Sequence, residues 1–239
     1  SMFAANNDTV PFFEDEQLDV VYERIFIFAV VWAFGGSLLE KSRVTFDAFL
    51  RNLLEENKSK CQFPSKLTVF DYFVDMAKMQ WVAFCDGTTN IHFTEQKNLE
   101  EQMIPTNSNA GPLFISRLLA THHHNLLLMG PESSKTLIVK TLFENVLDPT
   151  KFDCHTLPLS ANSTPTNISK FMQSFMHKRQ GNYGPLPSQH LLFLIDNIGA
   201  VKTEIYGAQP PLELLRQFND YGGWFKQFPS ILLILLTLH

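Results

Sequence analysis

The chain has 239 residues, of which 45% are hydrophobic and 18% charged, so it can bury a core in one large domain or a domain with a flanking piece. A net charge of −5 argues against the basic footprint of a nucleic-acid-binding protein. Cys61, Cys85 and Cys154 are far apart, which indicates a reduced, intracellular protein without a disulfide framework. The apolar runs at residues 25–34 and 231–238 are much shorter than the roughly 20 residues of a membrane-spanning helix, so we expect a soluble protein with no membrane partner.

The first 62 residues predict helices and no strand. A helix is expected to begin at Glu16, with acidic residues in its first turn, and to end at Gly35. Because its residues 25–34 are apolar on nearly all sides, we expect this helix to be buried between neighbouring elements. A second helix is predicted around residues 46–54, where apolar residues recur at amphipathic spacing.

The pattern changes after Pro64. Short strands are predicted at residues 67–70, 79–84 and 91–93, followed by a polar connector at residues 94–112. Beyond the connector, helices and strands alternate, which is typical of the α/β class with a parallel sheet and helices on both faces. The predicted elements are a helix at 113–121, a strand at 125–129, a turn at 130–134, a helix at 135–146, a strand at 155–159, a helix at 166–178 and a strand at 190–195.

An apolar strand, a turn of small residues and a Lys-Thr pair that opens a helix have the layout of a phosphate-binding loop. In such a loop the backbone amides surround the phosphates, Lys135 reaches the β- and γ-phosphates, and the hydroxyl of Thr136 binds Mg²⁺. The ligands predicted by this pattern are ATP or ADP with Mg²⁺. The candidate residues are Gly130, Pro131, Glu132, Ser133, Ser134, Lys135 and Thr136.

This loop departs from the pattern G-x-x-x-x-G-K-[ST] in two ways. Only four residues separate Gly130 from Lys135, where the pattern has five, and Ser134 replaces the second glycine. Because a Cβ then stands where the backbone must approach phosphate, we expect nucleotide to bind weakly or not at all. The alternative interpretation is an ordinary strand-turn-helix connection without a ligand.

A second candidate site follows the apolar strand at residues 190–195. An acid at the position of Asp196 orders the water shell of Mg²⁺ in ATPases. The next residue is usually an acid that polarises the attacking water. The amide of Asn197 cannot accept that proton, so we expect slow or absent hydrolysis. Alternatively, Asp196 only ends the strand.

Other polar residues do not form a catalytic set. The side chains of the consecutive residues His122, His123 and His124 splay around a helix end, so we expect no metal site there. Lys178 and Arg179 are expected at the carboxyl end of a helix, which favours cations. Neither the order nor the spacing of residues predicts a Ser-His-Asp or Cys-His nucleophile.

Several longer sequence segments resemble segments of the dynein heavy chain family. They occur in the same order as in that family and extend over nearly the whole chain, from about Ile25 to Phe225. Such ordered phrases are more specific than a lone phosphate-loop pattern. They are WAFGGSL at 32–38, TVFDYFVD at 68–75, IPT at 104–106, LSANST at 159–164, KRQGNYGP at 178–185, YGAQPPLELLRQ at 206–217 and DYGGWF at 220–225.

The resemblance implies an AAA+ module in a ring-shaped microtubule motor, in which the third module binds or hydrolyses nucleotide to regulate the first. Residues 1–62 would be the helical end of the second module, residues 63–112 a linker, and residues 113–239 a partial large subdomain of the third. Pro105 and Thr106 would belong to the loop on the adenine side. The implied partners are the neighbouring AAA modules and other motor subunits, in the cytoplasm and cytoskeleton or in the cilium and axoneme.

The chain also departs from the family. Members usually have a complete phosphate loop, an acid pair at the positions of Asp196 and Asn197, and Asp and Arg where residues 107–111 read NSNAG. They continue after Phe225 into a strand with a polar sensor residue and a helical lid, whereas residues 228–239 read as a short apolar tail. We therefore expect a degenerate, catalytically inactive module with a regulatory or structural role. The alternatives are a truncated isoform that acts as a scaffold and an unrelated P-loop enzyme such as a small kinase.

Overall fold

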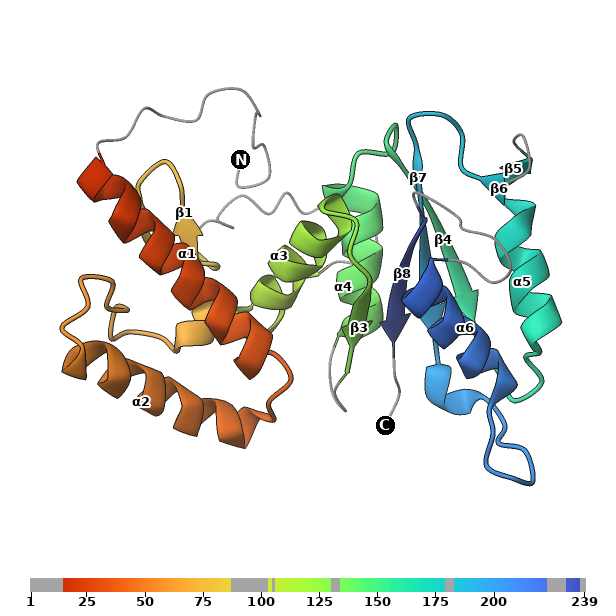
Figure 1. Cartoon of the computed structure of the whole chain (residues 1–239), viewed down its shortest axis with the longest axis horizontal. Coiled ribbons are helices and arrows are strands. Elements are labelled where there is room, and N and C mark those ends of the chain that lie inside the picture. Colours follow the sequence, from red (N-terminus) through yellow and green to blue (C-terminus); the bar gives the residue numbers. More distant parts are fainter. Residues whose placement is uncertain are drawn as a thin grey trace. The chain divides into compact units, whose positions relative to one another are not determined.

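The computed structural model describes residues 15–86, 103–104, 106–129, 134–178, 183–222 and 231–236. The chain falls into two compact units, whose elements are labelled in Figure 1. The first unit contains Ser1–Gln96 and Ile104–Gly111, and the second contains Lys97–Met103 and Pro112–His239. Within the described ranges, every helix is too short or too polar to cross a membrane.

The first unit consists of two helices, a 3₁₀ turn and a β-hairpin. The helices are α1 (Asp15–Gly35) and α2 (Glu40–Glu56), as the sequence predicts. In the hairpin, β1 (Tyr72–Asp75) pairs antiparallel with β2 (Gln80–Ala83), which confirms the predicted strand at residues 79–84. Buried side chains from all these elements form one core. Its members include Ile27, Val31, Leu50, Leu54, Cys61, Phe63, Val69, Phe70, Tyr72 and Ala83.

The strand predicted at residues 67–70 is wrong. Val69–Asp71 forms the 3₁₀ helix η1 instead, and the strand begins only at Tyr72. The backbone amide and the hydroxyl of Thr68 both donate to a carboxylate oxygen of Asp71, at 2.9 and 2.6 Å. This side-chain cap closes a turn, because it satisfies the backbone locally and competes with an extended conformation.

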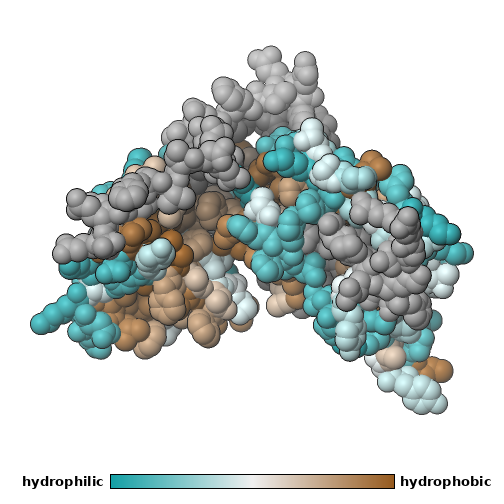
Figure 2. Space-filling view, turned by 45° about the horizontal axis from the view of Figure 1, so that its top comes forward, coloured by the Kyte–Doolittle hydropathy of each residue, from teal (hydrophilic) through white to brown (hydrophobic). Residues whose placement is uncertain are grey.

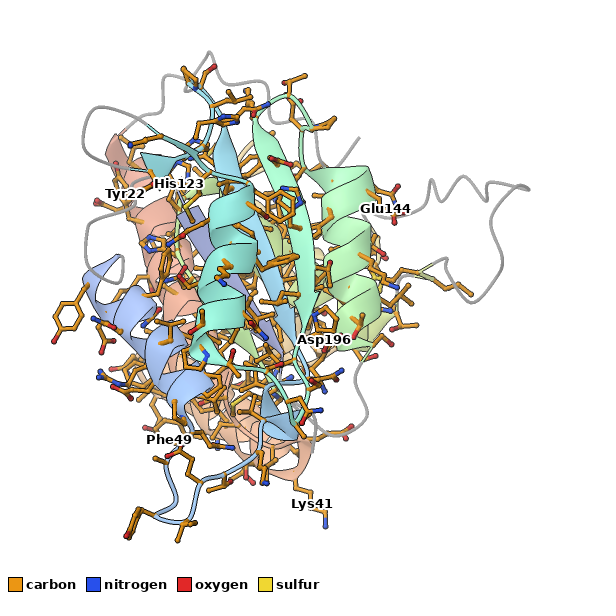
Figure 3. All side chains as sticks on the ribbon, turned by 90° about the vertical axis from the view of Figure 1, so that its right-hand side faces the viewer. Tyr22, Lys41, Phe49, His123, Glu144 and Asp196 are labelled. Carbon is orange, nitrogen blue, oxygen red and sulfur yellow. The ribbon has the colours of Figure 1, made fainter. Side chains whose placement is uncertain are left out.

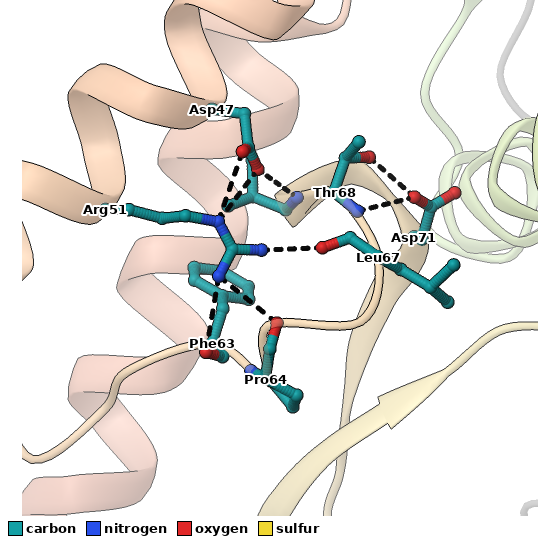
Figure 4. A network of polar contacts seen from close by, with 8 residues as sticks. Asp47, Arg51, Phe63, Pro64, Leu67, Thr68 and Asp71 are labelled. Carbon is teal, nitrogen blue, oxygen red and sulfur yellow. Dashed lines mark hydrogen bonds and ion pairs between the residues drawn. The ribbon is translucent and has the colours of Figure 1, made fainter.

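Hydrogen bonds from Arg51 connect α2 to the segment at residues 63–67 that follows it (Figure 4). The guanidinium of Arg51 donates to the backbone carbonyls of Phe63, Pro64 and Leu67, the last at 2.6 Å. It also forms an ion pair with Asp47 at 3.1 Å, and Asp47 accepts a hydrogen bond from the amide of Val69 at 2.7 Å. Carbonyl groups without a partner in regular structure are thus satisfied by one planar donor group.

The first unit keeps a large apolar surface. Val21, Ile27 and Val31 of α1 are buried, but Phe26 and Phe34 of the same helix are 68% and 70% exposed. Helix α1 is therefore not buried on all sides in this structure, and the prediction that it is buried between neighbouring elements is wrong. In Figure 2 the side chains of the first unit form extended brown areas on its surface.

The end of α1 requires glycine for steric reasons. A Cβ on Gly35 would lie 2.6 Å from the ring of Phe70, and a Cβ on Gly36 would lie 2.4 Å from the carbonyl oxygen of Trp32. Phe70 cannot easily move away, because it is buried and contacts the rings of Trp32 and Phe46 at centroid distances of 6.2 and 5.8 Å. The glycines that end the predicted helix therefore also permit close packing.

The second unit is built on a four-stranded parallel sheet, which confirms the predicted α/β class. The strand order is β3 (Leu126–Leu128), β8 (Ile231–Leu236), β7 (His190–Asp196) and β4 (Phe152–Pro158). Strand β7 is buried on both faces, as its continuous apolar run predicts.

Helices cover both faces of this sheet (Figure 1). Leu191, Phe193 and Ile195 pack with α5 (Pro165–Ser174) and α6 (Pro210–Tyr221) on one face. Leu192 and Leu194 pack with α3 and α4 on the other. The helices of that face are α3 (Asn107–Thr121), whose first turn belongs to the first unit, and α4 (Lys135–Thr141), followed by a π-helical turn at Leu142–Val146.

The apolar tail expected at residues 228–239 is instead an internal strand. Residues 231–236 form β8, which pairs in parallel with β3 on one side and β7 on the other. Leu235 is aligned with both Leu127 and Ile195. A run of six apolar residues is typical of a strand in a parallel sheet that helices cover on both faces.

The boundaries of helices α3 and α5 differ from the predictions. Helix α3 begins at Asn107 instead of residue 113, because Pro112 removes only one backbone hydrogen bond near the start of the helix. Helix α5 ends at Ser174, and the following residues form β5 (His177–Lys178), which pairs with β6 (Tyr183–Gly184). The strand predicted at residues 91–93 lies outside the described residues.

Candidate nucleotide-binding site

The carboxyl ends of β3 and β7 lie at the same edge of the sheet. Both strands run parallel to β8, with Leu128 aligned to Leu236 and Ile195 aligned to Leu235. Open α/β sheets bind ligands at this edge, where the loops leave the strands. The residues that follow β3 and β7 are therefore brought together. Gly130, Pro131, Glu132 and Ser133 lie outside the described residues.

Two side chains meet at this edge. The hydroxyl of Thr136, in the first turn of α4, donates to a carboxylate oxygen of Asp196, at the end of β7, over 3.4 Å. Figure 3 shows Asp196 at one end of the sheet. A hydroxyl and a carboxylate are hard oxygen ligands of the kind that Mg²⁺ prefers. The donor set therefore fits the metal that the sequence predicts there.

Lys135 and Ser134 open the helix that faces the loop. Lys135 is the first residue of α4 and only 6% exposed, which is unusual for a lysine. Ser134 is exposed and precedes the helix with φ −68° and ψ 37°. What Ser134 adds relative to glycine is a side chain at the start of the helix, where phosphate would approach the amides.

The carboxylate of Asp196 is oriented by its own chain. The amide of Asn197 donates to its second oxygen at 2.8 Å, and the amide of Leu159 donates to its backbone carbonyl at 2.8 Å. Asn197 adopts the left-handed conformation, with φ 59° and ψ 42°, which asparagine tolerates better than most residues. It precedes the 3₁₀ helix η4 (Ile198–Ala200).

The segment LSANST at residues 159–164 follows the end of β4 at this same edge. The amide of Ser160 donates to the hydroxyl of Ser163 at 2.9 Å, and Thr164 caps α5 by accepting from the amide of Asn167 at 3.2 Å. These local hydrogen bonds explain why small polar residues occur between the strand and the helix.

Thr106 belongs to the first unit, and Pro105 lies outside the described residues. The amide of Thr106 donates to the side chain of Asn109 at 2.7 Å, and the amide nitrogen of that side chain donates to the carbonyl of Ile104 at 2.8 Å. Asn109 thus fixes the backbone of the segment that, by its resemblance to dynein heavy chains, is predicted to lie on the adenine side.

His123 and His190 lie away from this edge. His123 stacks on His190, with ring centroids 4.1 Å apart, and His190 begins β7, at the end opposite to Asp196. Burial and the neighbouring His123 lower the pKa of His190. Figure 3 labels His123 and Asp196 at separate places of the unit.

Sequence reasoning missed one component of this edge. Strand β8 lies between β3 and β7, so the two candidate segments follow strands that are near neighbours in one sheet. Its apolar run could have revealed it, because six consecutive apolar residues between polar ones fit a buried parallel strand.

A parallel sheet, a helix that starts with Lys-Thr after the first strand, and an acid at the end of a central strand define a P-loop module of the AAA+ class. The comparisons with known proteins agree. Residues 91–233 match the family described as the P-loop containing dynein motor region, and residues 1–86 match the dynein heavy chain AAA lid domain. The chain belongs to the dynein heavy chain family.

Three curated relatives illustrate the similarity. Dynein axonemal heavy chain 1 of Mus musculus is 30% identical over 220 residues, and dynein axonemal heavy chain 12 of Homo sapiens is 30% identical over 215 residues, each covering 84% of this chain. Dynein axonemal heavy chain 2 of Homo sapiens is 27% identical over 217 residues and covers 90%. The chain spans only 5%, 7% and 5% of the length of these three relatives, respectively.

Proposed function

We propose that this chain is part of the motor ring of a dynein heavy chain and that its AAA+ module binds Mg²⁺ and nucleotide weakly, without hydrolysis, in a regulatory or structural role. The observation that carries the proposal is the contact between Thr136 and Asp196 beside Asn197. The hydroxyl of Thr136 and the carboxylate of Asp196, which suit the metal, face each other. The position where an acid would activate water is occupied by Asn197, whose side chain is an amide.

Weak binding follows from the loop. With one residue fewer between Gly130 and Lys135, fewer backbone amides can surround the phosphates, and Ser134 adds atoms where they would approach. We expect a dissociation constant of tens of micromolar for ATP or ADP, on the order of −6 kcal/mol. Lys135 would contribute its charge, and Thr136 and Asp196 would hold Mg²⁺, directly and through its water shell.

Absent hydrolysis follows from Asn197. General-base catalysis needs a group that can take a proton from the attacking water, and a carboxamide has no such basicity. The backbone of Asn197 is also fixed, because its amide is bonded to Asp196 and its carbonyl accepts from the amide of Ala200 at 2.9 Å.

The arrangement in the parent protein is part of the proposal. Residues 1–62 would end the second ring module, residues 63–112 would link it to the third, and residues 113–239 would form much of the large subdomain of the third. This order is supported by the family matches, because the dynein AAA lid domain matches residues 1–86 and the P-loop containing dynein motor region matches residues 91–233. Neighbouring modules and the other subunits of the microtubule motor would be the partners. The axonemal names of the relatives favour the cytoskeleton of a cilium over the general cytoplasm.

A second candidate function is a dynein-like scaffold that binds other proteins without nucleotide. The exposed aromatic residues of α1 favour it, since Tyr22, Phe26 and Phe34 present an apolar surface suited to protein contacts. The two functions differ in one respect: a scaffold of this kind would not need Lys135, Thr136 or Asp196.

Calorimetric titration with Mg²⁺ and ADP distinguishes them. We expect binding at tens of micromolar that falls by about tenfold or more in Lys135→Met, because the ammonium contact to phosphate is lost. Lys140→Met, in the same helix but exposed, is the matched control and should bind like the parent protein. Submicromolar binding would contradict the weak-site proposal. A folded protein without any heat of binding at millimolar ADP would favour the scaffold.

A further inference from the structure

An open groove in the first unit has a cationic lining. Its volume is about 800 Å³, which is in the range of pockets that hold small molecules. It is lined by the part of α1 at residues 19–24, the loop at residues 57–60 after α2, and residues 78–80 at the hairpin turn. Four basic and two acidic side chains leave it a net charge of +2, in a chain whose net charge is −5. These side chains are Arg24, Lys58, Lys60 and Lys78, with Asp19 and Glu23.

Lys58 occupies a backbone position that favours glycine. It follows the end of α2 with φ 51°, in the left-handed region. The amide of Lys58 donates to the carbonyl of Glu55, and the amide of Ser59 donates to the carbonyl of Leu54, both at 3.0 Å. This is the hydrogen-bond pattern of a Schellman cap, in which glycine fits without steric cost and a side chain does not. The fold itself therefore does not favour a lysine here, and a use for its charge would explain it.

The hairpin turn that carries Lys78 is also held in shape. The backbone amides of Ala77 and Lys78 donate to a carboxylate oxygen of Asp75, at 2.9 and 3.4 Å. The next residue, Met79, is again left-handed, with φ 53°. Its carbonyl accepts a hydrogen bond from the guanidinium of Arg24, so the turn is tied to α1.

The loop after α2 is tied to the same helix. The hydroxyl of Ser59 donates to a carboxylate oxygen of Glu23 at 2.6 Å and accepts from the amide of Cys61 at 2.9 Å. The thiol of Cys61 donates to the carbonyl of Val20 at 3.4 Å. One of the two carboxylates of the groove is thus engaged within the fold. A groove whose segments are fixed in advance loses little conformational freedom when a ligand binds.

The cations of the groove are available to an anion. Among the residues that the structure describes, the ammonium groups of Lys58, Lys60 and Lys78 form no ion pair. The buried Nε of Arg24 has no hydrogen-bond partner among those residues either. A buried donor without an acceptor costs free energy, and guanidinium and ammonium groups are the side chains with which proteins bind phosphate.

We propose that this groove binds a compact anion that carries several phosphate groups, of the kind represented by the inositol phosphates. The basic side chains come from three segments that converge on one cavity, which suits a compact ligand better than an extended peptide. Each ammonium group can then contact a separate phosphate as a point charge. The proposal is independent of the nucleotide site, which lies in the second unit.

Calorimetric titration of the 239-residue chain with inositol hexakisphosphate tests the proposal. At about 0.15 M salt, where attraction between exposed charges is screened, we expect a dissociation constant of tens of micromolar or lower. Mellitate, a ring with six carboxylates, is the control for charge alone and should bind about tenfold more weakly or worse. Cosedimentation with phosphatidylcholine vesicles only when they contain phosphatidylinositol bisphosphate would identify a lipid headgroup as the source of the phosphates. No cosedimentation would identify a soluble ligand.

Two pairs of substitutions locate the binding. Lys58→Gly with Lys78→Gln removes two of the four cations and should weaken binding about tenfold or more. Lys58→Gly alone should not lower the temperature of thermal unfolding, because glycine favours the left-handed conformation. Lys41→Gln with Lys66→Gln makes the same change of charge at exposed positions of the first unit outside the groove, and should bind like the parent protein.

Lys135→Met should also bind inositol hexakisphosphate like the parent protein, because Lys135 belongs to the other unit. Equal losses in the two pairs of lysine substitutions, equal affinity for mellitate, or no heat of binding at about one millimolar would each overturn the proposal. A loss in Lys135→Met as large as that in the groove variant would assign the phosphates to the nucleotide site and would overturn it as well.

Discussion

The hydroxyl of Thr136 lies 3.4 Å from a carboxylate oxygen of Asp196, although 60 positions separate the two residues in the sequence. The phosphate loop between β3 and α4 is one residue shorter than the P-loop pattern, yet the start of α4 still meets the end of β7. The shortening is therefore confined to the loop before Lys135. Thr136 and Asp196, which suit the metal, therefore still meet, whereas fewer backbone amides are expected to surround phosphate.

Repair of the loop should tighten nucleotide binding. Insertion of one glycine before residue 134 together with Ser134→Gly restores the spacing and the second glycine of the P-loop pattern. Because more amides can then face the phosphates, we expect the affinity for Mg²⁺ and ADP to rise about tenfold, or roughly 1.4 kcal/mol, by calorimetry. The gain should disappear when Lys135→Met is added. Unchanged affinity after repair would mean that another feature closes the pocket.

Much of this site could be predicted from the sequence, because its signals are local. An apolar strand followed by Lys135 and Thr136, and a second one followed by Asp196, are patterns within single segments. The conformation of Asn197 and the position of β8 could not be predicted in the same way. Strand order depends on how distant segments pair in the sheet, and periodicity encodes neither that order nor the conformation of a single residue after a strand.

The error at residues 67–70 has a different cause. Their apolar and β-branched residues favour a strand, but Thr68 and Asp71 cap each other and Asp47 takes up the amide of Val69. Side chains that satisfy the backbone locally override the average preference of neighbouring residues. The burial expected for α1 failed because composition reports that a face is apolar and does not report which element covers it.

Arg51 should be essential for the stability of the first unit. Its side chain bonds three backbone carbonyls and the carboxylate of Asp47, and the ion pair is only about one-fifth exposed. Arg51→Lys keeps the charge but cannot supply a planar fork of donors, so we expect a loss of about 2–3 kcal/mol in urea unfolding. Arg216→Lys, in an exposed ion pair with Glu213, should have little effect. Equal effects of the two changes would contradict this role.

Gly35→Ala should destabilise the first unit through a clash with Phe70. The added methyl would lie 2.6 Å from a buried ring, so the core must shift at a cost of about 1–3 kcal/mol. Thermal unfolding measures the loss. The double change Gly35→Ala with Phe70→Leu should cost less than the sum of the two single changes, because the smaller side chain leaves room for the methyl. Strict additivity would indicate that the destabilisation has another origin.

His190 should make the second unit less stable in acid. Burial and His123 lower the pKa of His190 in the folded protein, so the unfolded chain binds a proton more readily than the fold does. The contribution is therefore lost as the pH falls below about 6.5, the ordinary pKa of histidine, and through the lower pKa of the fold. Urea unfolding between about pH 7.5 and pH 5.5 should show a smaller loss of stability in His190→Gln than in the parent protein. The same pH dependence of stability in His190→Gln and in the parent protein would show that His190 does not contribute to the loss of stability in acid.

Release of phosphate from ATP shows directly whether this module hydrolyses nucleotide. We expect the protein with saturating ATP and Mg²⁺ to release phosphate no faster than the buffer does, because Asn197 cannot act as a base and the phosphate loop is short. Asn197→Glu alone should not restore turnover, since the effects of groups that act together are not additive. Mg²⁺-dependent release that increases in proportion to the protein concentration and disappears in Lys135→Ala would show that the module is an active ATPase.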